Sequence, residues 1–148
     1  MENREYSLEK QLHLTRIIKR GAVSLYIIAL LSVVNILLLT ITKMAIPFFT
    51  AFGVTSAMTY FMTGDGFFSV FLVLVALAFT LLFTILGIYG RRIHTWAFFT
   101  GFLVYTADCL LLILLQDWYS VILHAIIIYF IFAGLDAAKQ HDNPNTPS

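Results

Sequence analysis

The feature that most constrains the fold of this chain is a series of long segments without charged side chains. Residues 21–42 and 66–90 contain no Asp, Glu, Lys or Arg, and residues 93–107 and 118–135 are uncharged apart from one histidine in each. An α-helix needs about 20 apolar residues to cross the hydrocarbon core of a bilayer. These segments therefore predict an all-α integral membrane protein.

The composition leads to the same fold class. Hydrophobic residues make up 60% of the chain and charged residues only 11%, whereas soluble domains average about 25% charged residues. A single domain of 148 residues has too little interior to bury so much apolar surface. Contact with lipid would cover the remainder.

We predict a membrane domain over residues 22–138, built as a bundle of four transmembrane helices. The spans are expected at about 22–42, 67–89, 96–115 and 119–138. The polar residues 139–148 contain two prolines, and they are predicted to form a disordered cytoplasmic tail.

Residues 1–21 are predicted to form an amphipathic cytoplasmic segment. Ser7 is a suitable helix cap, and Leu8, Leu12 and Ile18 fall near one face of the helix that would follow it. Two arrangements remain open for this segment. It is either a helix that lies on anionic lipid headgroups or a solvated cap that continues into the first span.

The basic residues predict the orientation. With four spans, eight of them fall on one side of the membrane and Lys43 alone on the other, whereas five spans would divide them five to four. Cytoplasmic loops carry the excess of Lys and Arg, so we predict four spans with both termini in the cytoplasm, in a bacterial cytoplasmic membrane. The residues expected to anchor this topology are Arg16, Lys19, Arg20, Arg91 and Arg92.

Residues 43–66 are predicted to form a long apolar outer loop. The stretch is uncharged over residues 44–63 and nearly long enough to cross, but the orientation argument opposes a fifth span. Pro47, Gly53 and several Ser and Thr residues suit a bent segment buried against protein. Both an interfacial and a re-entrant course fit this composition.

The candidate site is the pair Asp108 and His124 in the last two spans. An ionisable residue near mid-bilayer costs roughly 2.5–3.5 kcal/mol on insertion scales, so the presence of each residue in a span indicates a structural or functional role. Both lie at similar distances from the turn at residues 116–118, which puts them about 10 Å from the same membrane face at about 1.5 Å rise per residue. We therefore predict a buried polar cluster of Asp108 and His124, with Tyr105 and Asn35 nearby.

Three interpretations of this cluster remain open. The first is structural: the pair fixes the register of the helices. In the second, the pair binds a ligand or carries one proton between two arrangements on a transport path. The third is catalysis or metal binding, but no third ligand accompanies the pair, and Ser120 lacks an oxyanion-forming glycine motif. The single cysteine, Cys109, excludes an internal disulfide.

Four spans enclose little interior, and the small residues on one face of the second and fourth spans exceed what one bundle needs. We therefore predict a non-enzymatic accessory or interaction subunit of an oligomeric membrane assembly. The alternative is a small proton-coupled carrier or channel that uses Asp108 and His124, and a membrane enzyme is the third class. We expect no catalytic residues, no metal and no cofactor. The expected partners are the lipid bilayer and either further copies of the chain or another membrane subunit. Nucleic acid is not expected, because the basic residues do not form a binding face.

Overall fold

The structure is a computed structural model that describes residues 2–42, 66–114 and 116–142. Over these residues the chain is helical apart from short turns, and no strand occurs among them. The predicted all-α class is thereby confirmed. The helices are α1 (Glu2–Thr42), α3 (Gly66–Arg91), α4 (Thr95–Leu114) and α5 (Trp118–Asp142).

Each of the four helices contains a stretch that is long and apolar enough to cross a membrane. The stretches are Leu8–Leu37, Val73–Arg91, Thr95–Leu114 and Trp118–Asp142. Large apolar side chains stand exposed on every helix, as at Leu30, Leu81 and Leu114. The predicted set of four apolar helices, each long enough to span a membrane, is therefore confirmed.

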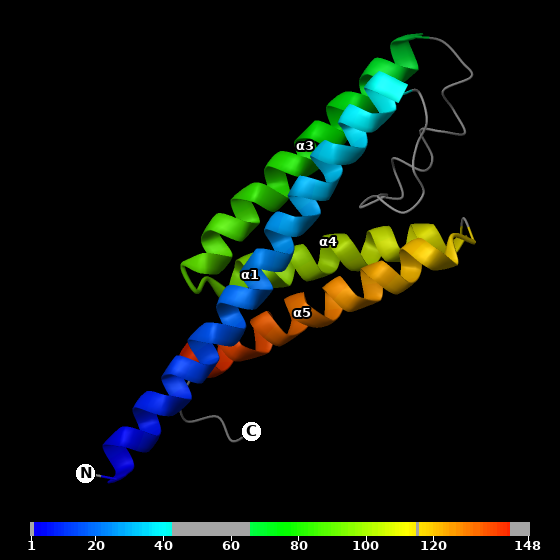
Figure 1. Cartoon of the computed structure of the whole chain (residues 1–148). Helices are drawn as coiled ribbons and strands as arrows, with labels where there is room; N and C mark the ends of the chain where they lie inside the picture. Colours follow the sequence, from blue (N-terminus) through cyan, green and yellow to red (C-terminus); the bar gives the residue numbers. More distant parts are fainter. Residues whose placement is uncertain (1, 43–65, 115, 143–148) are drawn as a thin grey trace.

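The helices form two antiparallel pairs, α1 with α3 and α4 with α5 (Figure 1). The pairs meet where the first half of α1 passes α5, and they diverge toward the end where α1 stops and α3 starts (Figure 1). A close approach joins Gly21 of α1 to Gly134 of α5. A Cβ built on Gly21 would lie 2.9 Å from the Cα of Gly134 and 3.0 Å from the carbonyl oxygen of Phe130. Glycine at such a crossing lets two helix backbones touch.

The N-terminal segment and the first span form one helix. Of the two arrangements left open for this segment, the structure has the one in which it continues into the first span, because α1 runs without interruption from Glu2 to Thr42. Leu14 and Ile18 are buried in the same apolar core as Leu135 and Ala138 of α5. This part of α1 therefore packs on protein and continues into the first span. No proline interrupts residues 2–42, which leaves nothing in the sequence to end the helix there.

The last helix also extends further than expected. Residues 139–142, which were assigned to the disordered tail, are the final residues of α5. Gln140 donates a hydrogen bond to Asp136 one turn earlier (3.0 Å), and Thr95 at the start of α4 donates one to the Asp142 carboxylate (2.7 Å). The rest of the tail, residues 143–148, lies outside the described residues, as does the outer loop up to residue 65.

The two short turns end their helices in the same way. Ile93 has a φ of 67° and Gln116 a φ of 59°, the left-handed conformation. Ile93 N–H donates to the Gly90 carbonyl (3.0 Å), and Gln116 N–H donates to the Ile113 carbonyl (3.0 Å). In each turn the next N–H reaches back one residue further, His94 to Tyr89 and Asp117 to Leu112. This is the Schellman pattern, which satisfies the last carbonyls of a helix.

Candidate functional site

The α4–α5 turn sets the level of the candidate site. Asp117 closes the Schellman turn of α4 through its N–H, and it also caps α5. Its carboxylate accepts bonds from the Ser120 N–H (3.3 Å) and the Ser120 hydroxyl (2.6 Å). An aspartate before the first helical residue, bonded to the N–H three positions later, is a standard N-cap. One residue thus ends one helix and starts the next, and this holds Asp108 and His124 at matching depth.

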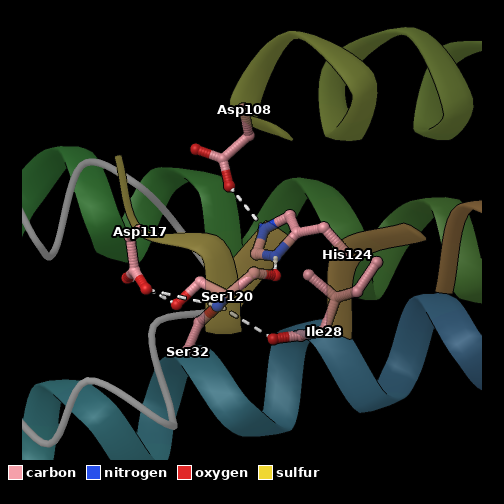
Figure 2. A network of polar contacts seen from close by, with 6 residues as sticks. All are labelled: Ile28, Ser32, Asp108, Asp117, Ser120 and His124. Atoms are coloured by element: carbon pink, nitrogen blue, oxygen red, sulfur yellow. Dashed lines mark hydrogen bonds and ion pairs between the residues drawn. The ribbon is translucent and has the colours of Figure 1, made fainter. Parts of the chain in front are cut away.

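Asp108 and His124 face each other across the two helices (Figure 2). The Nε2 atom of His124 lies 2.9 Å from Oδ2 of Asp108. The exposed fraction is 1% for His124 and 4% for Asp108. The contact is therefore a buried hydrogen-bonded pair, which is worth far more to the protein intact than with one member removed.

The second ring nitrogen of His124 determines how protons are placed in the pair. Nδ1 lies 2.8 Å from the backbone carbonyl oxygen of Ser120. A carbonyl only accepts, so Nδ1 carries a proton. The bond between Nε2 and Asp108 then holds one further proton, which belongs either to an imidazolium or to a neutral carboxyl group. In both forms the pair as a whole is electrically neutral.

Tyr105 joins the site through its ring. Its centroid lies 4.4 Å from that of the His124 imidazole, and the two planes are within 8° of parallel. Phe83 of α3 meets the ring of Tyr105 edge to face, with centroids 6.0 Å apart. Tyr105 and Phe83 are both almost completely buried. The stack adds a third constraint on the imidazole, beside its two hydrogen bonds, and links α4 and α5 to α3.

Two members of the surrounding polar network were not predicted as such: Asp117 was placed in the turn but not in the network, and Ser32 was not considered. Asp117 has the pattern of an N-cap, a carboxylate directly before an apolar helical run, and that signal would have identified it. Ser32 of α1 is drawn in the same network of polar contacts (Figure 2). Its hydroxyl donates to the Ile28 carbonyl in its own helix (2.8 Å), and no sequence signal singled it out.

Asn35 is not brought into this network by any hydrogen bond within the described part of the chain. Its side chain is 1% exposed, and both of its amide atoms lack a hydrogen-bond partner there. The expected topology anchors lie away from the pair. Arg16, Lys19 and Arg20 are exposed on the first half of α1, and Arg91 and Arg92 are exposed at the α3–α4 turn.

The geometry differs from that of a nucleophilic triad. A catalytic serine offers its hydroxyl to the histidine ring, whereas the Ser120 hydroxyl donates to Asp117 and its carbonyl faces His124. Within the described ranges, no three His, Cys, Asp or Glu side chains gather closely enough to hold a metal ion. The chemistry visible at the pair is the sharing of one proton.

Comparison with family models, curated proteins and solved structures found no match for this chain.

Proposed function

We propose that the chain is an integral membrane protein that serves as a non-enzymatic accessory or interaction subunit in an oligomeric membrane assembly. The observation that most supports this proposal is that both ring nitrogens and one face of the His124 ring have partners inside the protein. One ring nitrogen is hydrogen-bonded to the Asp108 carboxylate and the other to the Ser120 carbonyl oxygen, and the ring stacks on Tyr105. A polar centre with all its contacts inside the protein serves the fold, by fixing the register of α4 against α5.

Transport is the second candidate, and the shared proton is the observation in its favour. A carrier must bring that proton to both faces of the membrane. The two members of the pair are 1% and 4% exposed, and Nδ1 of His124 points at a peptide carbonyl. A carbonyl does not pass protons on, which argues against a relay through this side of the ring.

The proposed location is a bacterial cytoplasmic membrane, with both termini in the cytoplasm. Its support is the distribution of basic residues. The first half of α1, the α3–α4 turn and the end of α5 lie at one end of the bundle (Figure 1), and they carry most of the Lys and Arg residues. The α4–α5 turn, which contains no basic residue, lies at the opposite end. Single cysteines placed at His94 and Gln116 in a Cys109→Ala background should accept a membrane-impermeant label from opposite sides.

The decisive experiment compares association with proton movement. Two differently tagged copies are expressed together, and co-purification in mild detergent is measured for the wild type and for Asp108→Leu/His124→Leu. In parallel, both proteins are reconstituted into vesicles that contain a pH-sensitive dye. We expect the two copies to co-purify in both cases and the dye to report no proton flux. Proton flux that the double substitution abolishes, together with a wild type that does not self-associate, would replace the proposal with the carrier.

A further inference from the structure

A groove runs between α1 and α5 on the apolar surface of the bundle. It encloses about 460 Å³. Its walls are aliphatic and aromatic, and its polar residues are confined to one end. The lining residues are Arg20, Val23, Ser24, Ile27, Ile126, Ile127 and Phe130.

The close crossing of α1 and α5 explains why the groove exists. Gly21 and Gly134 bring the two backbones together. On α1 the lining starts with Arg20, directly before Gly21, and continues with residues that follow Gly21, whereas the lining residues of α5 precede Gly134. Because the helices are antiparallel, both sets lie on the same side of the crossing, where the two helices diverge (Figure 1). The wedge between them is the groove.

Arg20 stands at the narrow end of this wedge. It is the only charged residue among the described residues of the lining, and it is exposed. Its guanidinium makes no ion pair within the described part of the chain. Arg16 lies one turn earlier on the same face and is exposed as well. The two guanidinium groups mark the point where the charged part of α1 gives way to the uncharged part.

Among the other described lining residues, Ser24 alone has a polar side chain, and that side chain already has a hydrogen-bond partner. The hydroxyl of Ser24 donates to the carbonyl of Arg20 in its own helix (3.2 Å). The remaining side chains are Val, Ile and Phe, which suit a hydrocarbon chain. An occupant that matches both parts has an acyl chain and an anionic group at one end, because arginine binds phosphate through paired N–H donors.

We propose that the α1–α5 groove binds one phospholipid with an anionic headgroup. The acyl chain lies along Val23, Ile27 and Phe130, and the phosphate contacts Arg20, with Arg16 beside it. The proposal rests on the membrane location in the proposed function and is independent of the accessory role. A second groove, between α1 and α3, provides the contrast. It has a volume of about 400 Å³, and none of the described residues that line it is charged, so they give no basis for selecting an anionic headgroup.

The full chain, purified in a neutral detergent, is titrated with phosphatidylglycerol or with phosphatidylcholine of the same acyl chains, and bound lipid is counted by native mass spectrometry. We expect phosphatidylglycerol to bind more tightly. Arg20→Gln should weaken that binding about tenfold, the scale of a hydrogen bond to a charged group, and should leave phosphatidylcholine unchanged. Lys19→Gln is the matched control, since it removes the same charge from an exposed neighbour outside the groove and should have little effect.

Ile126→Trp fills the groove and should weaken the binding of both lipids. Ile122→Trp, on an exposed position of the same helix outside the groove, should not. If Arg20→Gln and Lys19→Gln weaken phosphatidylglycerol binding equally, the lipid is attracted by diffuse surface charge and the proposal is overturned. Undiminished lipid binding by Ile126→Trp would overturn it as well. A folded state is checked for every variant by helical circular dichroism.

The two proposals fail in different ways. If Ile126→Trp separates the two tagged copies and leaves lipid binding intact, the groove is an interface between copies and the lipid proposal is wrong. Lost lipid preference with intact association supports the lipid site and leaves the accessory role unaffected. If alkaline extraction releases the wild-type chain from membranes, the shared premise of membrane location is wrong.

Discussion

The imidazole of His124 lies flat against the ring of Tyr105, with 4.4 Å between the centroids and 8° between the planes. Two hydrogen bonds in the plane of the imidazole and one ring against its face leave it a single orientation. Tyr105 comes from α4 and the imidazole from α5, so the stack fixes both the rotation of these helices and their level. The polar pair is therefore as much a packing feature as an electrostatic one.

Tyr105→Leu should destabilise the protein through the loss of two aromatic contacts, with His124 and with Phe83. Each such pair contributes about 0.5–1.5 kcal/mol beyond its buried area. Tyr105→Phe keeps both ring contacts and should lose less. Thermal unfolding in detergent, followed by circular dichroism, measures the difference. Equal melting temperatures for the two variants would show that the ring stack does not stabilise the site.

The hydrogen-bond geometry predicts the tautomer of His124. Nδ1 should carry a proton in the folded protein, because its partner is a carbonyl oxygen. Nitrogen-15 NMR of the imidazole reports this directly, in a variant whose other histidines are replaced by glutamine. Asp108→Asn should keep Nδ1 protonated, since the new amide can donate to Nε2. A ring with a proton on Nε2 and a bare Nδ1 would contradict the assignment.

Hydropathy was sufficient to predict the four apolar helices, because uncharged runs near 20 residues leave few alternatives to a spanning helix. It left open whether the N-terminal segment continues into the first span, as α1 does from Glu2 to Thr42. Gly21 falls at the expected boundary, and glycine alone neither ends a helix nor guarantees its continuation. What holds the first half of α1 is its contact with α5 at Gly134, a tertiary feature that no local pattern records.

Asp108 and His124 were predicted to lie at one level, and Oδ2 of Asp108 lies 2.9 Å from Nε2 of His124. Depth depends only on the number of residues from the turn, which the sequence provides. Rotation about the helix axis is set by packing. The ring stack on Tyr105 and the hydrogen bond to the Ser120 carbonyl therefore could not be predicted from the sequence. Asn35 illustrates this limit: it is buried as expected, but its amide has no hydrogen-bond partner among the described residues.

Gln116→Gly should stabilise the protein. Gln116 has a φ of 59°, and a left-handed residue other than glycine costs roughly 1–2 kcal/mol. The greater freedom of glycine in the unfolded chain offsets about 0.4–1 kcal/mol of this. Gln140→Gly is the matched control, because Gln140 is helical and the same substitution should destabilise there. A lower melting temperature for Gln116→Gly would show that the turn is not strained.

Gly21→Ala should destabilise the protein by about 1–3 kcal/mol, the usual cost of inserting a methyl group into a filled space. The new Cβ would meet backbone atoms of Gly134 and Phe130 at 2.9 and 3.0 Å, and backbone does not yield easily. Gly87→Ala is the control, because the three atoms nearest to its Cβ would all belong to the ring of Tyr26, at 3.1 Å, and a side chain can move. If both variants unfold at the same temperature, the α1–α5 crossing is looser than the structure indicates.

The coupling between Asp108 and His124 is measured by a double-mutant cycle. Removing one member of a buried charged pair typically destabilises by about 3–5 kcal/mol, whereas replacing both by apolar residues can be nearly neutral. Asp108→Leu/His124→Leu should therefore be more stable in detergent than His124→Leu alone, although it carries one more substitution. Asp108→Leu combined with Thr95→Ala, at the far end of α4, is the control cycle and should be additive. Additivity in the Asp108–His124 cycle as well would mean that the two side chains do not stabilise each other, and the structural role assigned to the pair would be lost.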